Sequence, residues 1–213
     1  MWGDIAEQAE LLEAGDKTST HFLASIVPAP SPQNEATFPR LLVVDGQQHL
    51  TTLSLALAAI RDHIADAQSD EAERIDEEYL INKCKSGNDR LRLLPTQADR
   101  AQFAAHICGT PADQPTGDSV TAAYKFFRQK PVQAEYPAAQ QDVFRLEQAI
   151  TSRLTLVAVT AERGDNVHRI FESLNNTGLK LSQADLLRNF LFMRLPTHGE
   201  DVYKSTGFPC RTV

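Results

Sequence analysis

Four consecutive positions of the sequence combine a carboxylate, a glycine and two amides: Asp45, Gly46, Gln47 and Gln48. They lie between a short apolar run, 41–44, and a stretch with helical periodicity. A helix start presents backbone N–H groups and the positive end of the helix dipole, and this arrangement binds anions such as phosphate. There, Asp45 could hold a metal ion or a water molecule, and a glutamine could orient an attacking water, as one does in some GTPases. The same spacing also suits a helix cap by Asp45 followed by glutamines that only face solvent.

Other motifs limit the chemistry further. The sequence contains no GxxxxGK[ST] loop, so a nucleotide site would differ from that of the P-loop NTPases. Its cysteines, Cys84, Cys108 and Cys210, are odd in number, far apart and outside any CxxC pair. This favours a reducing cytoplasm and argues against a disulfide framework or a zinc site. The histidines from His49 onward have no ligand spacing to one another, so no metal site is predicted from them.

Composition excludes several classes of protein. The chain has 213 residues, 21 Lys+Arg against 28 Asp+Glu, and a net charge of −7. Its longest apolar stretch, 53–60, is far shorter than the ~20 residues of a membrane span. The first residues are neither basic nor followed by an apolar segment, so no signal peptide is predicted. An acidic chain is a poor general DNA-coating protein, although a local basic groove remains compatible with this charge.

The elements that must position the acidic loop read as an α+β fold. Apolar spacings of three and four predict helices, and alternation or short apolar runs predict strands. Pro28 is expected to end the first strand, and the continuous apolar run of the second suggests burial on both faces. Gly15 is expected to terminate the first helix. The predicted helices are 1–14, 47–66, 98–107, 120–129, 138–150, 165–174 and 182–194, and the predicted strands are 21–27, 41–44, 91–94 and 153–160.

The stretch 44–53, VDGQQHLTTL, closely resembles the DGQQRLTTL signature of the N-terminal domain of GmrSD-type, modification-dependent restriction systems. Three further stretches follow in the order of that family. WGDI at 2–5 resembles its first helix, and HFLASIV at 21–27 resembles its HFLGSIV strand. The stretch 171–189, FESLNNTGLKLSQADLLRN, resembles its second signature, FExLNxxGxxLxxxDLxxN. The resemblance implies a ParB/sulfiredoxin-like small sheet with helices, followed by a mainly helical portion.

The resemblance also implies an activity. In such families the loop is implicated in binding and hydrolysis of an NTP, often GTP, with Mg²⁺, coupled to sensing of modified phage DNA. A C-terminal HNH-type nuclease domain or subunit, absent from this chain, commonly cuts the DNA. Carried over to this sequence, the catalytic candidates are Asp45, Gln47 and Gln48, and the nucleotide-binding candidates are Gly46, His49, Thr51 and His21. For His21, a locally hydrogen-bonded strand residue is an equal alternative.

The second signature adds four candidates: Asn175, Gly178, Asp185 and Asn189. Gly178 supplies a turn with positive φ, and Asn175 can satisfy backbone groups of that turn. Asn175 and Asp185 could complete the pocket, or they could fix the corner between two helices. We favour the structural role.

Three departures from the family pattern bear on activity. The family has an upstream segment whose Gln and Arg reach the pocket, and this sequence starts after it. The motif arginine is His49 here, which is shorter and cannot fork two hydrogen bonds to a phosphate. Residues 205–213 depart from the family sequence, which a neighbouring reading frame would restore, so we expect a frameshifted tail. Nucleotide hydrolysis by this polypeptide is therefore expected to be weak or absent.

The predicted organisation follows these motifs. It comprises a partial ParB-like core with the loop at 1–68, a mainly helical insertion at 69–150, a completing part at 151–204 and the tail at 205–213. Two other functions remain compatible with the sequence. One is a ParB-like nuclease in which Asp45 helps to cut DNA, and the other is a non-catalytic module that binds modified DNA or a partner. No membrane partner is expected.

Overall fold

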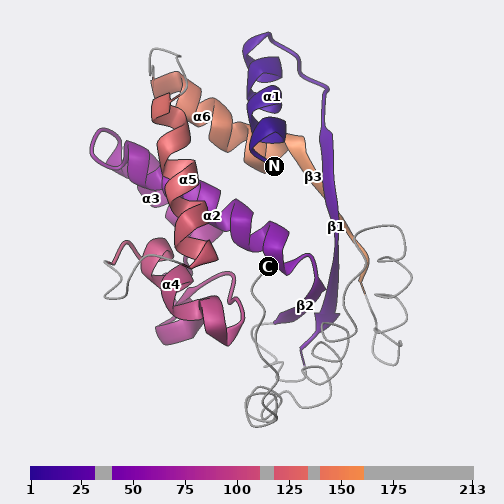
Figure 1. Ribbon diagram of the computed structural model, residues 1–213, viewed down its shortest axis with the longest axis vertical. Helices are drawn as coiled ribbons and strands as arrows, with labels where there is room; N and C mark the ends of the chain where they lie inside the picture. Colours follow the sequence, from indigo (N-terminus) through magenta and orange to yellow (C-terminus); the bar gives the residue numbers. More distant parts are fainter. Residues whose placement is uncertain (32–39, 111–117, 134–139, 161–213) are drawn as a thin grey trace. The chain divides into compact units, whose positions relative to one another are not determined.

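The computed structural model describes residues 1–31, 40–110, 118–133 and 140–160 (Figure 1). The elements of this part, in chain order, are α1 (Trp2–Glu13), β1 (His21–Pro30), β2 (Leu41–Asp45), α2 (Gln47–Ile64), α3 (Ser69–Ile75), α4 (Gln97–Ile107), α5 (Ser119–Gln133), α6 (Gln140–Gln148) and β3 (Leu154–Ala158). A π-helical turn follows α3 and another follows α6, and a 3-10 turn precedes α4: Asp76–Leu80, Ala149–Arg153 and Gly87–Arg90, respectively. The fold is α+β, as predicted.

The chain divides into two compact units. Among the described residues, the first, helical unit lies within 1–24 and 47–157, and the second lies within 25–46 and 158–160. The five helices predicted between residues 1 and 150 are all present. The helices predicted over 165–174 and 182–194 lie outside the described residues. The domain boundaries expected from the sequence stay a prediction.

Helix α2 forms the centre of the helical unit, where α3, α4, α5 and α6 all contact it (Figure 1). Apolar residues at three- and four-residue spacing are buried in the second half of α2, at Leu57, Ile60 and Ile64. Burial is nevertheless continuous from Leu55 to Arg61, so that several faces of the helix are covered. The residues between the large side chains are alanines, which let neighbouring helices approach closely. An apolar stripe in a sequence indicates one buried face only, so it does not show that neighbouring helices cover several faces of α2.

Helix α1 ends as the sequence predicts. Gly15 has a φ of +81°. Its N–H donates to the carbonyl of Leu12 (3.1 Å), and the N–H of Asp16 donates to the carbonyl of Leu11 (3.0 Å). These two bonds form the Schellman motif, which satisfies the last carbonyls of a helix.

The sheet has the order β2-β1-β3, and β1 runs antiparallel to β2. Contrary to the prediction, β1 continues through Pro28 and ends at Pro30. The pairing steps from Val27–Asp45 to Pro28–Val43, which leaves the intervening residue of β2 without a partner in the register. Such a bulge interrupts the ladder of hydrogen bonds, and proline is tolerated there because its missing N–H is not required.

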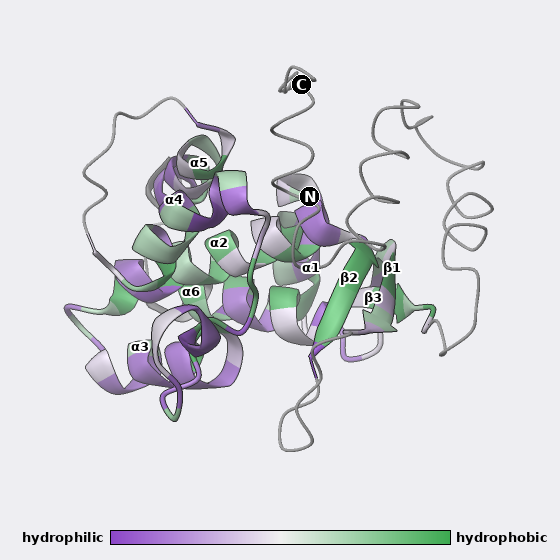
Figure 2. Ribbon diagram, turned by 90° about the horizontal axis from the view of Figure 1, so that it is seen from below, coloured by the Kyte–Doolittle hydropathy of each residue, from purple (hydrophilic) through white to green (hydrophobic). Residues whose placement is uncertain are grey.

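The prediction that β2 is buried on both faces is wrong. Val44 is 6% exposed, but Leu41 and Leu42 are 59% and 37% exposed. The strand is hydrophobic along its length, as its green colour in Figure 2 shows. Strands buried on both faces belong to parallel sheets covered by helices, whereas β2 is paired antiparallel at the edge of a small sheet.

The strand predicted over 91–94 is also absent. Only a single antiparallel bridge forms, between Leu91 and Ile81. The N–H of Arg92 donates to the carbonyl of Leu80 (3.0 Å), and the N–H of Asn82 donates to the carbonyl of Arg90 (2.7 Å). The run is apolar because Leu91 is buried in the helical core, and not because it belongs to a sheet.

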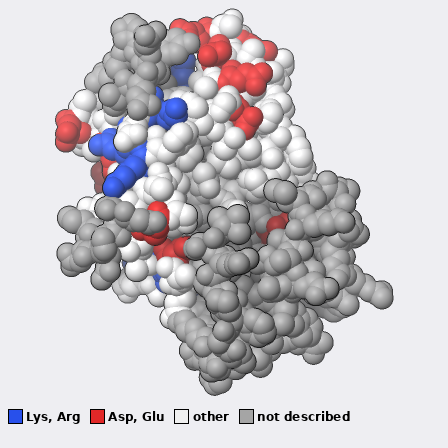
Figure 3. Space-filling model, in the orientation of Figure 1, with Lys and Arg blue, Asp and Glu red and all other residues white. Residues whose placement is uncertain are grey.

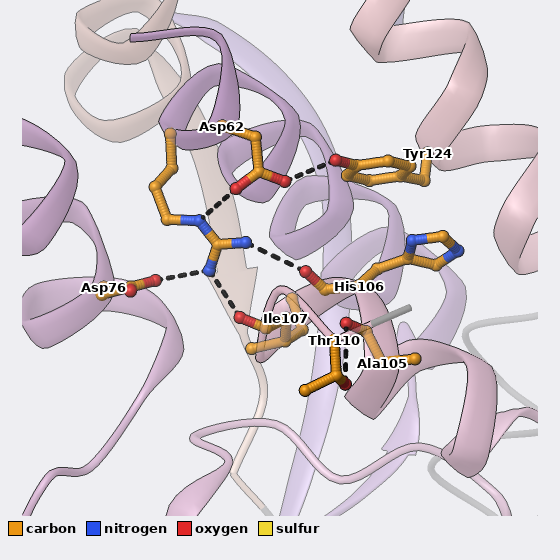
Figure 4. A network of polar contacts seen from close by, with 8 residues as sticks. Asp62, Asp76, Ala105, His106, Ile107, Thr110 and Tyr124 are labelled. Carbon is orange, nitrogen blue, oxygen red and sulfur yellow. Dashed lines mark hydrogen bonds and ion pairs between the residues drawn. The ribbon is translucent and has the colours of Figure 1, made fainter. Parts of the chain in front are cut away.

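A buried arginine ties the central helix to its neighbours (Figure 4). Arg61 of α2 donates to the carboxylates of Asp62 and Asp76. It also donates to the carbonyls of His106 (2.9 Å) and Ile107, the last residues of α4. The final carbonyls of a helix lack partners within the helix and carry its negative dipole end. Arg61 therefore acts as a cationic cap for α4 that is supplied by another helix.

Two titratable ring residues, His106 and Tyr124, lie next to this cap. The His106 ring stacks on Tyr124 at 4.2 Å between centroids, and its Nε2 lies 3.1 Å from Oγ1 of Thr121. Burial lowers the pKa of His106. The carboxylates of Asp118 and Asp62 oppose this shift, and the positive charge of Lys125 adds to it. Burial, together with the hydrogen bond to Asp62, raises the pKa of Tyr124 to about 12. Both groups are thus held neutral around pH 7.

We expect His106 to make the protein less stable in mild acid. A histidine whose pKa is lowered by folding binds its proton more readily in the unfolded chain, so stability falls as the pH drops below about 6.5. In His106→Gln the loss of unfolding free energy between pH 7.5 and 5 should be smaller than in the original protein. Urea unfolding at both pH values measures this. Some loss should remain, because burial also lowers the pKa of His63. An identical loss in both proteins would contradict the assignment.

Candidate functional site: the DGQQ loop

The loop begins with a turn that only glycine fits. Asp45 is the last residue of β2 and pairs with Val27. Gly46 follows at a φ of +88° and is buried. A Cβ atom at this position would lie 2.4 Å from Cγ2 and 3.2 Å from Cα of Ile26. Both the backbone conformation and the contact with β1 therefore require a residue without a side chain.

Helix α2 begins at the next residue. Gln47 and Gln48 are exposed in its first turn, and His49 and Thr51 are half-buried. The first turn contains no acidic side chain, which would repel an anion. Gly46 has no side chain with which to cap the first N–H groups of the helix. The start of α2 thus has the polarity that a phosphate requires, with two exposed glutamines in its first turn.

The boundary between the two compact units falls inside this motif. Asp45 and Gly46 belong to the second unit, whereas Gln47 and the following residues belong to the helical unit. The four candidate residues are neighbours because they are consecutive in the chain. Among the described residues, no hydrogen bond between Asp45 and the start of α2 supports the alternative in which Asp45 caps this helix.

The partner of His21 is a residue of α1 rather than of the DGQQ loop. Its Nε2 lies 3.6 Å from Oδ1 of Asp4 on α1. The residue of β1 that pairs with Asp45 is Val27, six positions further along the strand. This geometry supports the structural alternative for His21, a strand residue with a local partner.

The second set of candidates is not placed. Asn175, Gly178, Asp185 and Asn189 lie outside the described residues, as do the helices predicted to carry them. Ile26, in contrast, was not among the sequence candidates, although it sets the space around Gly46. Its sequence context, an apolar strand residue, indicates only burial; the strand register was needed to find it.

A family model for the N-terminal domain of the GmrSD restriction endonuclease matches residues 1–192. The chain belongs to this family. The match includes both signatures, and it identifies the chain as a module of a DNA-acting restriction protein. Among curated proteins, none matches the chain. No helix of the GmrSD N-terminal domain has the length and apolar character to cross a membrane, as far as the described residues extend.

Proposed function

We propose that this GmrSD N-terminal domain binds the phosphates of a nucleotide, with GTP as the first candidate, at the DGQQ loop. The observation that carries the proposal is the forced turn at Gly46, which leads directly into a helix start with two exposed glutamines. A side chain at position 46 is excluded by Ile26, so the backbone amides that follow are not covered from this position. In the chain's cytoplasmic setting, which we also propose, GTP is an available ligand.

The residues of the loop fit a nucleotide with Mg²⁺. Magnesium is usually held by one or two carboxylates together with the phosphates of its nucleotide. No group of three or more acidic, histidine or cysteine side chains could hold a metal ion in the part of the chain that the structure describes. Within the loop, Asp45 supplies one carboxylate. The expected role of this chain is to bind and orient: Asp45 would hold the metal ion, and Gln47 and Gln48 would donate to phosphate or position water.

Calorimetry with GTP and Mg²⁺ tests the loop. Replacing both glutamines, Gln47→Ala with Gln48→Ala, should weaken GTP binding by about tenfold or more, because even one hydrogen bond to a charged phosphate contributes a net ~1.5–3 kcal/mol and ~1.4 kcal/mol corresponds to tenfold. His49→Arg should strengthen binding, since a guanidinium adds a permanent charge and a two-pronged contact. Gln97→Ala is the matched control, because Gln97 is also an exposed first residue of a helix.

Three outcomes would contradict the proposal. They are absence of GTP binding by both the original protein and His49→Arg, equal weakening in Gln97→Ala, and magnesium-dependent nicking of DNA that Asp45→Ala abolishes. The last result would favour the nuclease alternative.

The proposal extends to the partners of the family. We propose modified DNA as the signal and an HNH-type nuclease domain or subunit as the effector. Family membership supports both, because a restriction system must couple recognition of foreign DNA to cleavage. Hydrolysis is expected to be weak, since His49 replaces an arginine that would pair with phosphate. Binding of modified DNA without nucleotide turnover would favour the non-catalytic alternative.

A further inference from the structure

Helix α5 concentrates positive charge in an acidic protein. Its 15 residues, SVTAAYKFFRQKPVQ, include Lys125, Arg128 and Lys130 and no aspartate or glutamate. The whole chain has a net charge of −7. In Figure 3 blue side chains gather at the upper left, the side on which α5 runs in Figure 1. The helix is therefore a local basic face of the kind that net charge alone does not reveal.

The cations of α5 differ from four others in the helical unit. Arg61, Arg74, Lys83 and Arg145 form ion pairs with acidic side chains. No ion pair joins the three α5 cations to an acidic side chain among the described residues. The nearby carboxylates are already engaged: Asp118 accepts from Thr121, and Asp62 from Arg61 and Tyr124. The positive charge of α5 is therefore available to an external anion.

The exposed surface of α5 is continuous. Lys125, Phe126 and Gln129 are exposed, and Arg128 and Lys130 are half-buried at its two margins. At 1.5 Å per residue, Lys125 and Lys130 are about 7.5 Å apart along the helix axis. Five residues also turn the helix by about 140°, so the two lysines lie toward opposite margins of the exposed surface and fit an extended ligand with several charges rather than a single small anion.

Phe126 determines which nucleic-acid contact is favoured. It is 43% exposed, but the ammonium of Lys130 lies over its ring, 4.8 Å from the centroid. Its neighbour Phe127 packs against it edge-on, at 5.4 Å and 85°. A ring face occupied by a lysine is not open for stacking with a base. The aromatic group therefore holds Lys130 in place, and the surface presents cations to a phosphate backbone.

We propose that the outer face of α5 is a docking surface for the phosphate backbone of duplex DNA, with Lys125, Arg128 and Lys130 as the phosphate contacts. The inference rests on the DNA-acting part of the proposed function but not on nucleotide binding at the loop. It adds a surface by which this domain is held on DNA independently of base sequence. Recognition of a modified base would then take place elsewhere in the restriction system.

The salt dependence of DNA binding tests this surface. For duplex DNA, log K falls with log salt with a slope of about −0.9 for each phosphate contact. With three contacts, affinity of the full chain for a labelled unmodified duplex should fall about 40-fold between 50 and 200 mM salt. In Lys125→Gln with Arg128→Gln, one contact remains and the fall should be only about 3-fold to 4-fold. Fluorescence anisotropy measures both values.

The matched control removes one lysine and one arginine elsewhere. Lys17 and Arg90 are exposed in the same helical unit. Lys17→Gln with Arg90→Gln changes the net charge equally, so its salt dependence should equal that of the original protein. Should the α5 double variant fail to fold by circular dichroism, Lys125→Gln with Lys130→Gln provides the same test. The proposal would be overturned if the α5 variant and the control variant reduced the salt dependence equally, or if the original protein did not bind duplex DNA.

Two further results separate this proposal from its alternatives. Tighter binding to a single-stranded probe that Phe126→Ala abolishes would overturn backbone docking in favour of base stacking. Binding to anionic lipid vesicles without binding to duplex DNA would overturn it in favour of a membrane surface. The double glutamine variant of the loop should retain the salt dependence. Loss of GTP binding in that variant with unchanged DNA binding therefore supports both sites separately.

Discussion

Gly46→Ala is expected to destabilise the protein by about 2–5 kcal/mol. A non-glycine residue in a left-handed backbone conformation costs about 1–2 kcal/mol, and overpacking of a filled space costs about 1–3 kcal/mol more. Both terms apply, because φ is +88° and the added Cβ would lie 2.4 Å from Cγ2 of Ile26. For a protein of this size, each kcal/mol lowers the melting temperature by about 2–4 °C. Thermal unfolding followed by circular dichroism measures the effect.

Gly15→Ala separates the cost of the backbone conformation from the cost of overpacking. Gly15 has a similar φ of +81°, but an added Cβ would meet no atom within 4 Å. This variant should therefore lose only the backbone term, about 1–2 kcal/mol. In the Gly46→Ala background, Ile26→Ala removes Cγ2, so the two changes together should cost less than the sum of their separate effects. Equal losses in the two glycine variants would show that Ile26 does not restrict the turn.

The turn at Gly46 also shows what the sequence could predict. The loop between a strand and a helix follows from the apolar run 41–44, the glycine at 46 and the helical periodicity of the residues after it. The close approach of Ile26 does not, because it depends on which residue of β1 lies beside β2. Register is set by the bulge between Val27 and Pro28, and no local pattern near residue 46 encodes it.

The errors of the sequence analysis have a common physical cause. Apolar runs at 41–44 and 91–94 both predict strands, the first of them buried on both faces. One is an edge strand with two exposed leucines, and the other contributes Leu91 to a helical core through a single bridge. Hydrophobicity in a short run indicates that some side chains are buried, but it does not specify the partner that buries them. Long helices were predicted correctly, since their periodicity extends over many residues.

The ionic interactions were the least predictable feature from sequence. The acidic stretch 70–79 reads as a solvated face, yet Asp76 binds the buried Arg61 and Arg74 joins three glutamates, Glu71, Glu78 and Glu147. Glu147 belongs to α6, more than seventy residues away. Such pairs depend on how helices pack and not on local spacing. The same reasoning explains why the basic face of α5 could not be recognised before the pairing of other cations was known.

Arg61→Met is expected to destabilise the helical unit by about 3–5 kcal/mol. Arg61 is 5% exposed, and burial opposes its charge, but the hydrogen bonds with Asp62 and Asp76 prevail and raise its pKa. Methionine preserves much of the apolar volume while leaving both carboxylates and the carbonyls of His106 and Ile107 without their donor. A buried acceptor that loses its donor costs about 1–3 kcal/mol, and two carbonyls lose theirs here, whereas Asp62 and Asp76 are 27% and 26% exposed and are partly compensated by water. Chemical unfolding monitored by circular dichroism should therefore show a much lower midpoint.

Two comparisons show whether this loss comes from the network. Arg90→Met makes the same substitution at an exposed position and should change stability by less than about 0.5 kcal/mol. Asp76→Asn in the Arg61→Met background removes the carboxylate that has lost its partner, so it should cost less there than in the original protein. Additive effects of these two changes would show that the pair is not coupled. In that case α4 would be held by apolar packing alone, and the cap at its end would contribute little to the attachment of α4 to α2.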